Sequence, residues 1–311
     1  MQTQIRHTSQ RHANYLKCGS ITVLLLLAVC QFALAERYAL IIGISNYPKE
    51  SGFSTTTGAN DIPYALAALV YYGFDAKNIT ILKDSAATYE AITYSLHDIT
   101  KKVKPGDDVF LHFSGHGQRV INYSKNRYEK DDSSWVPYNA HKSYKKWVYS
   151  GQSHLIDDEL NTILHTIKGK IGESGRISVV VDACYSEGST RDLKPRRQIR
   201  GVSETFSVPA DDFLVLKEKN SDTAPENWLT LSACSDFEFN QEYREKDCGL
   251  LTYILYVKLK DKASTVPAST LLTLITEKYD QILKQQFNAL PQTPHLDGPD
   301  NLKAQPFVRH D

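Results

Sequence analysis

Two residues of this sequence, His116 and Cys184, are of the types that nucleophilic catalysis uses, and each follows a largely apolar run of strand length. The runs at 109–113 and 177–181 lack strict polar alternation, which is typical of strands buried on both faces of a parallel sheet. In open α/β sheets, reactive groups collect beyond the carboxyl ends of the strands. If the two runs are neighbouring strands, His116 and Cys184 meet at one edge of the sheet as a base and its nucleophile.

The chemistry of such a pair is acyl transfer. A free thiol has a pKa of about 8.5, so an imidazole is needed to remove its proton and later to protonate the leaving amine. The N–H groups of Gly117 and Cys184 can form an oxyanion hole, worth roughly 2.7–4 kcal/mol per donor. The alternative for each motif alone is structural, with His116 capping a strand and Cys184 filling core. The two motifs together, each after a matching strand, favour catalysis.

Hydrophobic patterning and capping residues predict alternating strands and helices. The expected strands are 38–44, 78–82, 109–113, 177–181 and 228–233, with 307–308 closing an edge, and the expected helices are 60–73, 88–102, 157–168, 249–260 and 269–287. Asn60 or Asp61 is expected to cap the first helix. This alternation predicts right-handed parallel crossovers. The polar segment 118–153 is expected to be a long loop with room for a short hairpin.

The composition and the first 35 residues indicate an exported globular protein. Of 311 residues, 41% are hydrophobic and 23% charged, and the net charge of zero argues against nucleic-acid binding. Basic residues precede an apolar stretch at 21–35, and small residues at 33–35 offer a cleavage site, so 1–35 is predicted to be a signal peptide. We expect a periplasmic or secreted protein with no stable membrane insertion after signal removal. An uncleaved anchor and, less so, a lipidated Cys30 are the alternatives.

Three cysteines, Cys184, Cys234 and Cys248, remain after the predicted signal peptide. An odd number leaves at least one thiol free, as a nucleophile requires. A Cys234–Cys248 disulfide is an alternative that the sequence leaves open.

The order of short motifs along the mature chain resembles that of clan CD cysteine peptidases. The motifs are Arg37 to Tyr47, Gly58-Ala59-Asn60-Asp61, Ser114-Gly115-His116-Gly117, Val136-Pro137, Ile156 to Leu160, Asp182-Ala183-Cys184, Leu231 to Cys234, Gly249 to Tyr253 and Gln292-Thr293-Pro294. Within the clan, the sequence is similar to the caspase-like family C14, most of all to metacaspases and their bacterial relatives.

The resemblance implies a fold and a domain plan. The fold is α/β, a three-layer caspase-like fold with a mostly parallel six-stranded sheet and helices on both faces. Residues 36–311 form the peptidase domain, with a p20-like part at about 36–190, a basic loop at about 189–204 and a p10-like part at about 225–311.

In metacaspases an acidic pocket receives Arg or Lys before the scissile bond, and the matching residues here are Asp61, Ser114 and Asp182. Two carboxylates in a partly desolvated pocket favour a guanidinium or ammonium and repel an acidic side chain. Asp182 stands where caspases, which cut after Asp, have Gln. For Asp61, helix capping is the structural alternative.

Three positions depart from the metacaspase pattern. Tyr185 replaces a His, Gly58 replaces a common Cys, and Glu187 resembles an insertion. They alter pocket walls rather than base or nucleophile, so they bear on efficiency and not on reaction type.

The resemblance also implies calcium as an activator, because many metacaspases bind it through aspartates near the active site. The closest matches are Asp131, Asp157, Asp158 and Asp192, and carboxylate oxygens suit Ca²⁺. The alternative for Asp157 and Asp158 is stabilisation of a helix N-terminus. The chemistry itself requires no cofactor.

The predicted function is a cysteine endopeptidase that hydrolyses peptide bonds after Arg or Lys through a thioacyl-enzyme on Cys184. Its expected partners are proteins or peptides with a basic residue before the scissile bond and no nucleic acid, and a monomer is expected. The basic loop also predicts self-cleavage. The alternatives are a caspase-like peptidase with another preference and a caspase-like binding module without turnover, against which the intact His116 and Cys184 argue.

Overall fold

The computed structural model describes residues 35–124, 127–185, 199–202, 204–209, 225–235, 238–286 and 289–310, and only the backbone over 122–124 and 127–131. One compact unit runs from Glu36 to Asp311. The predicted signal peptide lies outside the described residues except for Ala35, and so does most of the predicted basic loop.

A six-stranded sheet lies at the centre of this unit, in the order β11-β8-β7-β3-β1-β2. Its strands are β1 (Arg37–Gly43), β2 (Ile79–Lys83), β3 (Asp108–Ser114), β7 (Arg176–Asp182), β8 (Leu229–Ser232) and β11 (His295–Asp297). Neighbouring strands pair in parallel, except for β11, which runs antiparallel to β8. The predicted mostly parallel six-stranded sheet is confirmed.

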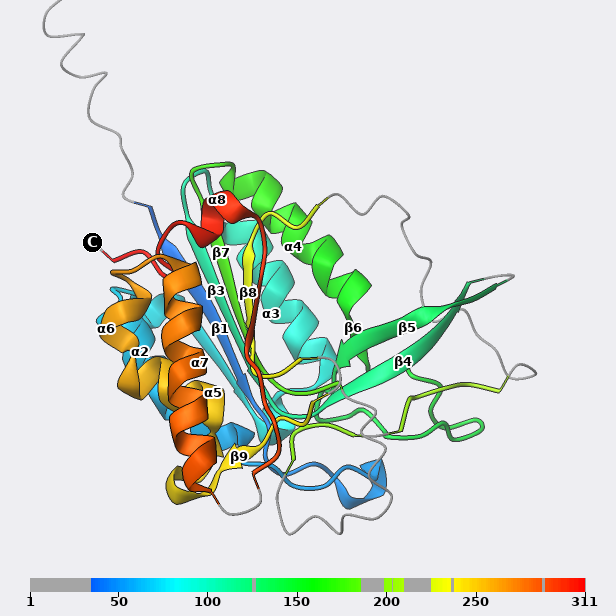
Figure 1. Cartoon of the computed structure of the whole chain (residues 1–311). Coiled ribbons are helices and arrows are strands. Elements are labelled where there is room, and N and C mark those ends of the chain that lie inside the picture. Colours follow the sequence, from blue (N-terminus) through cyan, green and yellow to red (C-terminus); the bar gives the residue numbers. More distant parts are fainter. Residues whose placement is uncertain are drawn as a thin grey trace, which may run out of the picture. The chain divides into compact units, whose positions relative to one another are not determined.

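Helices cover both faces of the sheet because successive side chains of the buried strands point to opposite sides (Figure 1). On β3, Val109, Leu111 and Phe113 enter one core with α3 (Tyr89–Lys102) and α4 (Asp157–Ile171), whereas Phe110 enters the other. The second core contains α2 (Gly58–Tyr71) and α7 (Ala268–Gln285). The predicted three-layer α/β arrangement is thus confirmed.

The register between β3 and β7 fixes the position of the two predicted catalytic motifs. The two strands pair from Asp108 and Arg176 at one end to Ser114 and Asp182 at the other, without a shift. The motifs that follow these strands therefore leave the sheet at the same edge.

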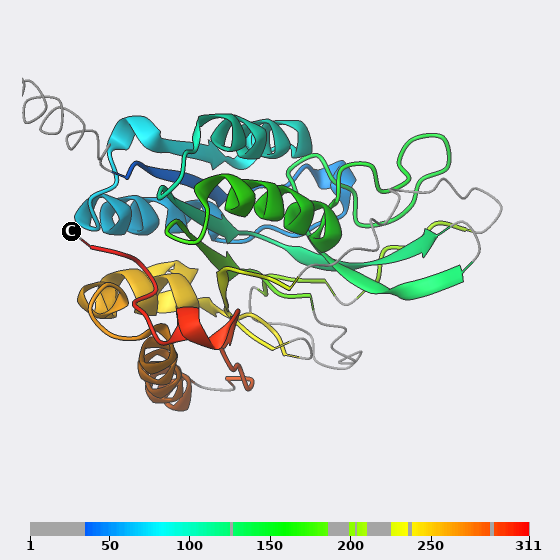
Figure 2. The same ribbon diagram turned by 90° about the horizontal axis from the view of Figure 1, so that it is seen from above.

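A hairpin follows β3 almost at once, in the segment predicted to be a long loop with room for a short hairpin. It consists of β4 (Gly117–Ser124) and β5 (Arg127–Trp135), and the short β6 (Leu155–Ile156) pairs with the end of β5. The hairpin extends beyond the central sheet in both views (Figures 1 and 2). The pairing of β6 with β5 brings the start of α4 beside the hairpin that follows the His116 motif.

Two other predictions of local structure are wrong. The edge strand is β11 and not 307–308, because the fully buried Phe307 packs into the core. The predicted helix at 249–260 is broken into α5 (Leu250–Tyr253), a π-helical turn (Ile254–Lys258) and α6 (Lys260–Ala263). Among the described residues, no helix combines the length and apolarity needed to cross a membrane.

His112 of β3 gives the fold a measurable pH dependence. It is fully buried, and its Nδ1 lies 3.1 Å from the Tyr256 hydroxyl. Burial lowers the pKa of His112 to about 4. Between the unfolded pKa of about 6.5 and pH 4, the unfolded chain binds a proton that the folded chain does not, so stability is lost as pH falls through this window.

We predict that His112→Gln, which keeps hydrogen-bonding capacity toward Tyr256, weakens this pH dependence. The wild-type unfolding free energy should fall faster than that of the variant, by about 1.4 kcal/mol per pH unit across the window, because one linked proton is removed. Denaturant unfolding of both proteins at several pH values between 7 and 4 measures the difference. Parallel stability curves would contradict the assignment.

Candidate active site

His116 lies between the end of β3 and the start of β4 and is fully buried. Its ring packs against those of Phe53 and Tyr47, at centroid distances of 5.5 and 5.1 Å. Its backbone N–H donates to the Tyr47 hydroxyl at 3.0 Å. Burial lowers the pKa of His116 to about 4. The imidazole is therefore neutral near pH 7, which is the form that can accept a proton.

The hydrogen bonds of His116 identify the ring nitrogen that can act as a base. Nε2 lies 2.9 Å from the carbonyl oxygen of Ser54, which can only accept, so Nε2 carries the proton. In the neutral ring Nδ1 then holds the lone pair, and within the described part of the chain this buried atom has no hydrogen-bond partner. Nδ1 is the atom of His116 that can act on a thiol or a leaving group.

Cys184 follows the end of β7 by two residues, as His116 follows the end of β3. Cys184 is buried, and its sulfur lies 2.6 Å from the Glu238 carbonyl oxygen. Gly117 packs so closely that a Cβ there would lie 2.5 Å from the Cys184 carbonyl oxygen. The structure therefore brings the two motifs into contact, and the absence of a side chain at Gly117 permits the approach.

Asp61, Ser114 and Asp182, the predicted pocket residues, lie together and are fully buried. They surround the guanidinium of Arg200, which is fully buried as well. Its Nη1 lies 2.6 Å from Asp61 Oδ2, 3.2 Å from Asp182 Oδ1 and 2.6 Å from Ser114 Oγ. The pocket that the sequence predicts for a basic residue thus contains a basic residue of the chain itself.

Glu242 and Thr57, which sequence reasoning missed, complete the surroundings of Arg200. Nε lies 3.3 Å from Glu242 Oε1, and Nη2 donates to Thr57 Oγ1 at 2.8 Å. Burial alone would lower the pKa of Arg200, but the charges of Asp61, Asp182 and Glu242 raise it above its usual value. Three carboxylates thus contact one guanidinium.

Asp182 is held ionised by its neighbours. Burial pushes its pKa up, but the charge of Arg200 and hydrogen bonds from Asn240 and Thr252 bring the pKa below its ordinary value. Asn240 Nδ2 donates to Oδ1 at 2.7 Å, and the Thr252 N–H and hydroxyl donate to Oδ2 at 2.9 and 2.7 Å. A Cβ at Gly249 would lie 2.1 Å from Oδ2, so this wall of the pocket requires glycine.

Asp61 serves the pocket and does not cap α2. The helix begins at Gly58 after Thr57, whose side chain makes no capping hydrogen bond, and Asp61 lies in the first turn. Its carboxylate accepts from the Gly249 N–H at 2.8 Å and from the Ser114 hydroxyl, besides contacting Arg200. The capping alternative for Asp61 is therefore wrong.

Arg200 lies in a short segment whose backbone pairs with residues 240–241. Ile199 forms an antiparallel bridge with Gln241, and the Arg200 N–H donates to the Asn240 carbonyl at 3.0 Å. This pairing is how extended peptides bind a free backbone edge, with the side chain in a pocket giving specificity.

The next residues of this segment pass Cys184. A Cβ at Gly201 would lie 2.9 Å from Cys184 Cβ, so the Arg200–Gly201 peptide bond runs from the acidic pocket to the predicted nucleophile. Further along, the Gln118 side chain donates to the Glu204 carbonyl at 2.9 Å, and the buried Phe206 pairs with β4. The segment is anchored on both sides of this bond.

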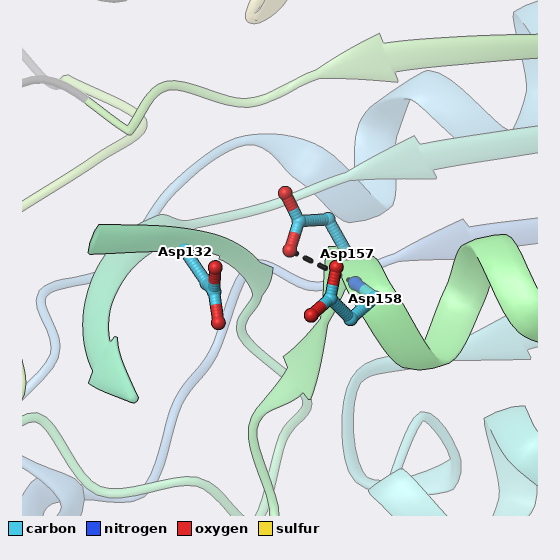
Figure 3. Close-up of side chains that lie close together, drawn as sticks. All are labelled: Asp132, Asp157 and Asp158. Carbon is cyan, nitrogen blue, oxygen red and sulfur yellow. Dashed lines mark hydrogen bonds between the residues drawn. The ribbon is translucent and has the colours of Figure 1, made fainter. Parts of the chain in front are cut away.

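Asp132, Asp157 and Asp158 form a candidate cation site in which carboxylate oxygens, one from each residue, lie within 4.8 Å of one another (Figure 3). Asp132 lies on β5, and the other two open α4. Burial and the charges of Asp132 and Asp158 raise the pKa of Asp157 to about 7. Three clustered carboxylates offer hard oxygen donors, which fit Ca²⁺ in chemical type.

Of the four predicted calcium ligands, Asp157 and Asp158 lie in this cluster. Asp192 and the side chain of Asp131 lie outside the described residues. Asp132 was missed, although it directly follows Asp131 in the sequence.

The structure describes two of the three positions that depart from the metacaspase pattern, Gly58 and Tyr185. A Cβ at Gly58 would lie 2.4 Å from the Ser114 carbonyl oxygen, so a Cys at this position requires a backbone shift. Tyr185 packs against the core, and its carbonyl accepts from Arg119 Nε at 3.0 Å. Glu187 lies outside the described residues. Cys184, Cys234 and Cys248 are all free, so the alternative Cys234–Cys248 disulfide is not formed.

Comparison with known proteins agrees with this architecture. The chain is 29% identical over 271 residues to metacaspase-3 of Trypanosoma brucei brucei, covering 82% of this chain and 69% of the relative. It is 28% identical over 183 residues to metacaspase-1 of Eremothecium gossypii, covering 57% of this chain and 37% of the relative. It is 30% identical over 167 residues to metacaspase-7 of Arabidopsis thaliana, covering 52% of this chain and 37% of the relative. The chain thus spans well under half the length of two of these relatives.

Solved structures share the fold. A crystal structure of a Geobacter sulfurreducens protein superposes with a TM-score of 0.60 at 21% identity, covering 89% of this chain and all of that chain. Caspase-1 of Spodoptera frugiperda superposes with a TM-score of 0.53 at 14% identity, covering 85% and 86% of the two chains. At these identities the likeness shows the fold alone.

The layered parallel sheet, with Cys and His motifs in contact at one edge, defines the class of caspase-like cysteine peptidases. The sequence model of the caspase domain, peptidase family C14, matches residues 36–300. This chain belongs to that family and is related to the metacaspases.

Proposed function

We propose that this protein is a cysteine endopeptidase that cuts after Arg or Lys, with Cys184 as nucleophile and His116 as base. The observation that carries the proposal is the buried guanidinium of Arg200, held by Asp61, Ser114 and Asp182 with the following peptide bond at Cys184. A pocket that satisfies a guanidinium this fully recognises the same group in a substrate.

The proposed reaction uses the two ring nitrogens of His116 differently. Nε2–H stays bonded to the Ser54 carbonyl and orients the ring, while Nδ1 takes the proton of the Cys184 thiol. The thiolate attacks the carbonyl carbon after the basic residue, and the protonated Nδ1 gives its proton to the leaving amine. Water then hydrolyses the thioacyl-enzyme with Nδ1 as base. The N–H groups of Gly117 and Cys184 are proposed to bind the oxyanion.

The proposal also covers the substrates, the oligomeric state and the export of the protein. The substrates are proteins or peptides with a basic residue before the scissile bond, and the chain acts as a monomer. Residues 1–35 export the protein to the periplasm or the medium. No observation specifically favours a binding module without turnover.

Fluorogenic peptides that end in Arg, Lys, citrulline or Asp test the pocket, because citrulline keeps the shape of Arg without its charge. We predict that kcat/KM falls by about 30- to 4,000-fold from Arg to citrulline, since the buried carboxylates would lose their partner at a cost of roughly 2–5 kcal/mol. The Asp peptide should not be cut. Cys184→Ala should abolish all hydrolysis. Equal rates for Arg and citrulline would refute charge recognition, and activity in Cys184→Ala would refute the nucleophile.

Self-cleavage at Arg200–Gly201 is the second prediction of the proposed function, because Arg200 fills the acidic pocket and Gly201 packs against Cys184. Mass spectrometry of the purified wild type should find fragments that end at Arg200 and begin at Gly201. Cys184→Ala and Arg200→Gln should lack this cut, whereas Arg200→Lys and the control Arg197→Gln should retain it. A wild-type chain that stays intact, or is cut only elsewhere in the loop, would contradict the assignment.

Calcium binding at Asp132, Asp157 and Asp158 is the third prediction. Isothermal titration calorimetry should detect Ca²⁺ binding that Asp157→Asn weakens, because one of three clustered carboxylates loses its charge. Asp98→Asn is the control, since Asp98 lies on α3 in an exposed pair with Lys102. Absence of binding at millimolar Ca²⁺, together with activity unchanged by a chelator, would reject a calcium activator.

A further inference from the structure

Cys234 lies beside the proposed nucleophile, and the proposed mechanism does not use it. It follows β8, which neighbours β7 with Val181 opposite Ser232. The pairing continues past the strands, because the Ala233 N–H donates to the Val181 carbonyl at 3.0 Å. Cys234 Sγ then lies 3.8 Å from the carbonyl oxygen of Ala183, the residue before Cys184.

The thiols of Cys184 and Cys234 form a buried pair. Neither is in a disulfide, and their positions follow the paired ends of β7 and β8. Interaction with the Cys184 side chain, together with burial, raises the pKa of Cys234 well above its ordinary value, so Cys234 rests as the thiol. Neighbouring strands lie about 4.7–4.9 Å apart, within the Cα separations of about 4.4–6.8 Å that a disulfide spans.

We propose that Cys234 is the redox partner of Cys184, and that a peroxide converts the pair into a disulfide that blocks the nucleophile reversibly. The inference rests on the proposed role of Cys184. It assigns to Cys234 a role in protecting the site.

The chemistry proceeds in two balanced steps. The Cys184 thiolate attacks one oxygen of the peroxide, and the O–O bond breaks to give a sulfenic acid and water after protonation. The Cys234 sulfur then attacks the Cys184 sulfur, so that the S–S bond forms and the S–O bond of the sulfenic acid breaks. The proton of the Cys234 thiol passes to the leaving hydroxide, which departs as the second water. A dithiol reverses the disulfide by exchange. Without a partner thiol, the sulfenic acid proceeds irreversibly to sulfinic and sulfonic acids.

Cys184 and Cys234 are both buried, so only a small oxidant can reach their sulfur atoms. Gly201 lies directly over Cys184, where even a Cβ would be 2.9 Å from Cys184 Cβ. Cys234 is 8% exposed. Hydrogen peroxide is therefore the probe of choice, rather than a bulky disulfide.

The test compares wild type, Cys234→Ser and Cys248→Ser after treatment with hydrogen peroxide. Cys248 is the matched control, because it is also buried and free but lies on β10 (Cys248–Gly249) beside the acidic pocket. Peptide mapping without reductant should find Cys184 linked to Cys234 in wild type and in Cys248→Ser, with the loss of two hydrogen atoms per chain. In Cys234→Ser, Cys184 should instead reach sulfinic or sulfonic acid.

Activity provides the second readout. Dithiothreitol should restore the peroxide-treated wild type and Cys248→Ser to their untreated rates, whereas Cys234→Ser should stay inactive. The proposal is overturned if wild type shows no Cys184–Cys234 link, if the link involves Cys248, or if Cys234→Ser recovers as fully as wild type. Because the link is measured by mass, a chain without peptidase activity would refute the proposed function and leave this result readable.

Discussion

A guanidinium enclosed by carboxylates, with no access to water, is the interaction on which this site depends. Each buried ion costs several kcal/mol to desolvate, and only close opposite charges and hydrogen bonds offset that cost. Arg200 meets this condition through Asp61, Asp182 and Glu242. The other oxygens of Asp61 and Asp182 accept from backbone N–H groups, whereas Glu242 Oε1 accepts from both Arg200 and the Thr57 N–H. Glu242 Oε2 has no hydrogen-bond partner within the described residues. If Arg200 leaves, Asp61, Asp182 and Glu242 lose the one cation that forms ion pairs with them within the described residues. Under the proposed function, a basic side chain of a substrate replaces this cation, which is the physical basis of the proposed preference for Arg or Lys.

The proposed base, His116, needs the opposite environment, one that disfavours charge. His116 stands in an apolar and aromatic surrounding, and burial lowers its pKa to about 4, so it rests neutral. Asp182, two residues before Cys184, is ionised because donors converge on it. The parallel register of β3 and β7 thus places an uncharged base at one strand end and a charged pocket wall at the other, within one short edge of the sheet. Under the proposed function, the pocket that binds the substrate and the base that transfers the proton thus differ in electrostatic environment although they lie at the same edge of the sheet.

Features that depend on local sequence pattern, such as the buried strands and the motifs at their ends, could be predicted from the sequence. Two buried runs ending in His116 and Cys184 sufficed to place both motifs at one sheet edge, and the acidic pocket followed from the family resemblance. Arg200 could not be assigned, since its partners lie up to 143 residues away in the chain. The one sequence feature that pointed to Arg200 as the occupant of the pocket was its place at the end of a run of basic residues, directly before Gly201. The metacaspase resemblance implied Asp131, and Asp132 was missed because the sequence does not fix which face of β5 each of its residues occupies. The π-helical turn within the predicted helix at 249–260 likewise reflects tertiary packing.

Because Arg200 is part of the chain, it competes strongly with external substrates for the acidic pocket. The connection from Tyr185 to Ile199 is short, so Arg200 is presented to the pocket at an effective concentration on the order of millimolar. A free peptide of equal intrinsic affinity at micromolar concentration competes about a thousandfold less well. Under the proposed function, hydrolysis at Gly201 separates Arg200 from the anchors at Glu204 and Phe206 and adds a carboxylate beside an acidic pocket. Both changes weaken the resident segment without altering the pocket. A single cut would therefore convert the enzyme's own first substrate into a displaceable ligand.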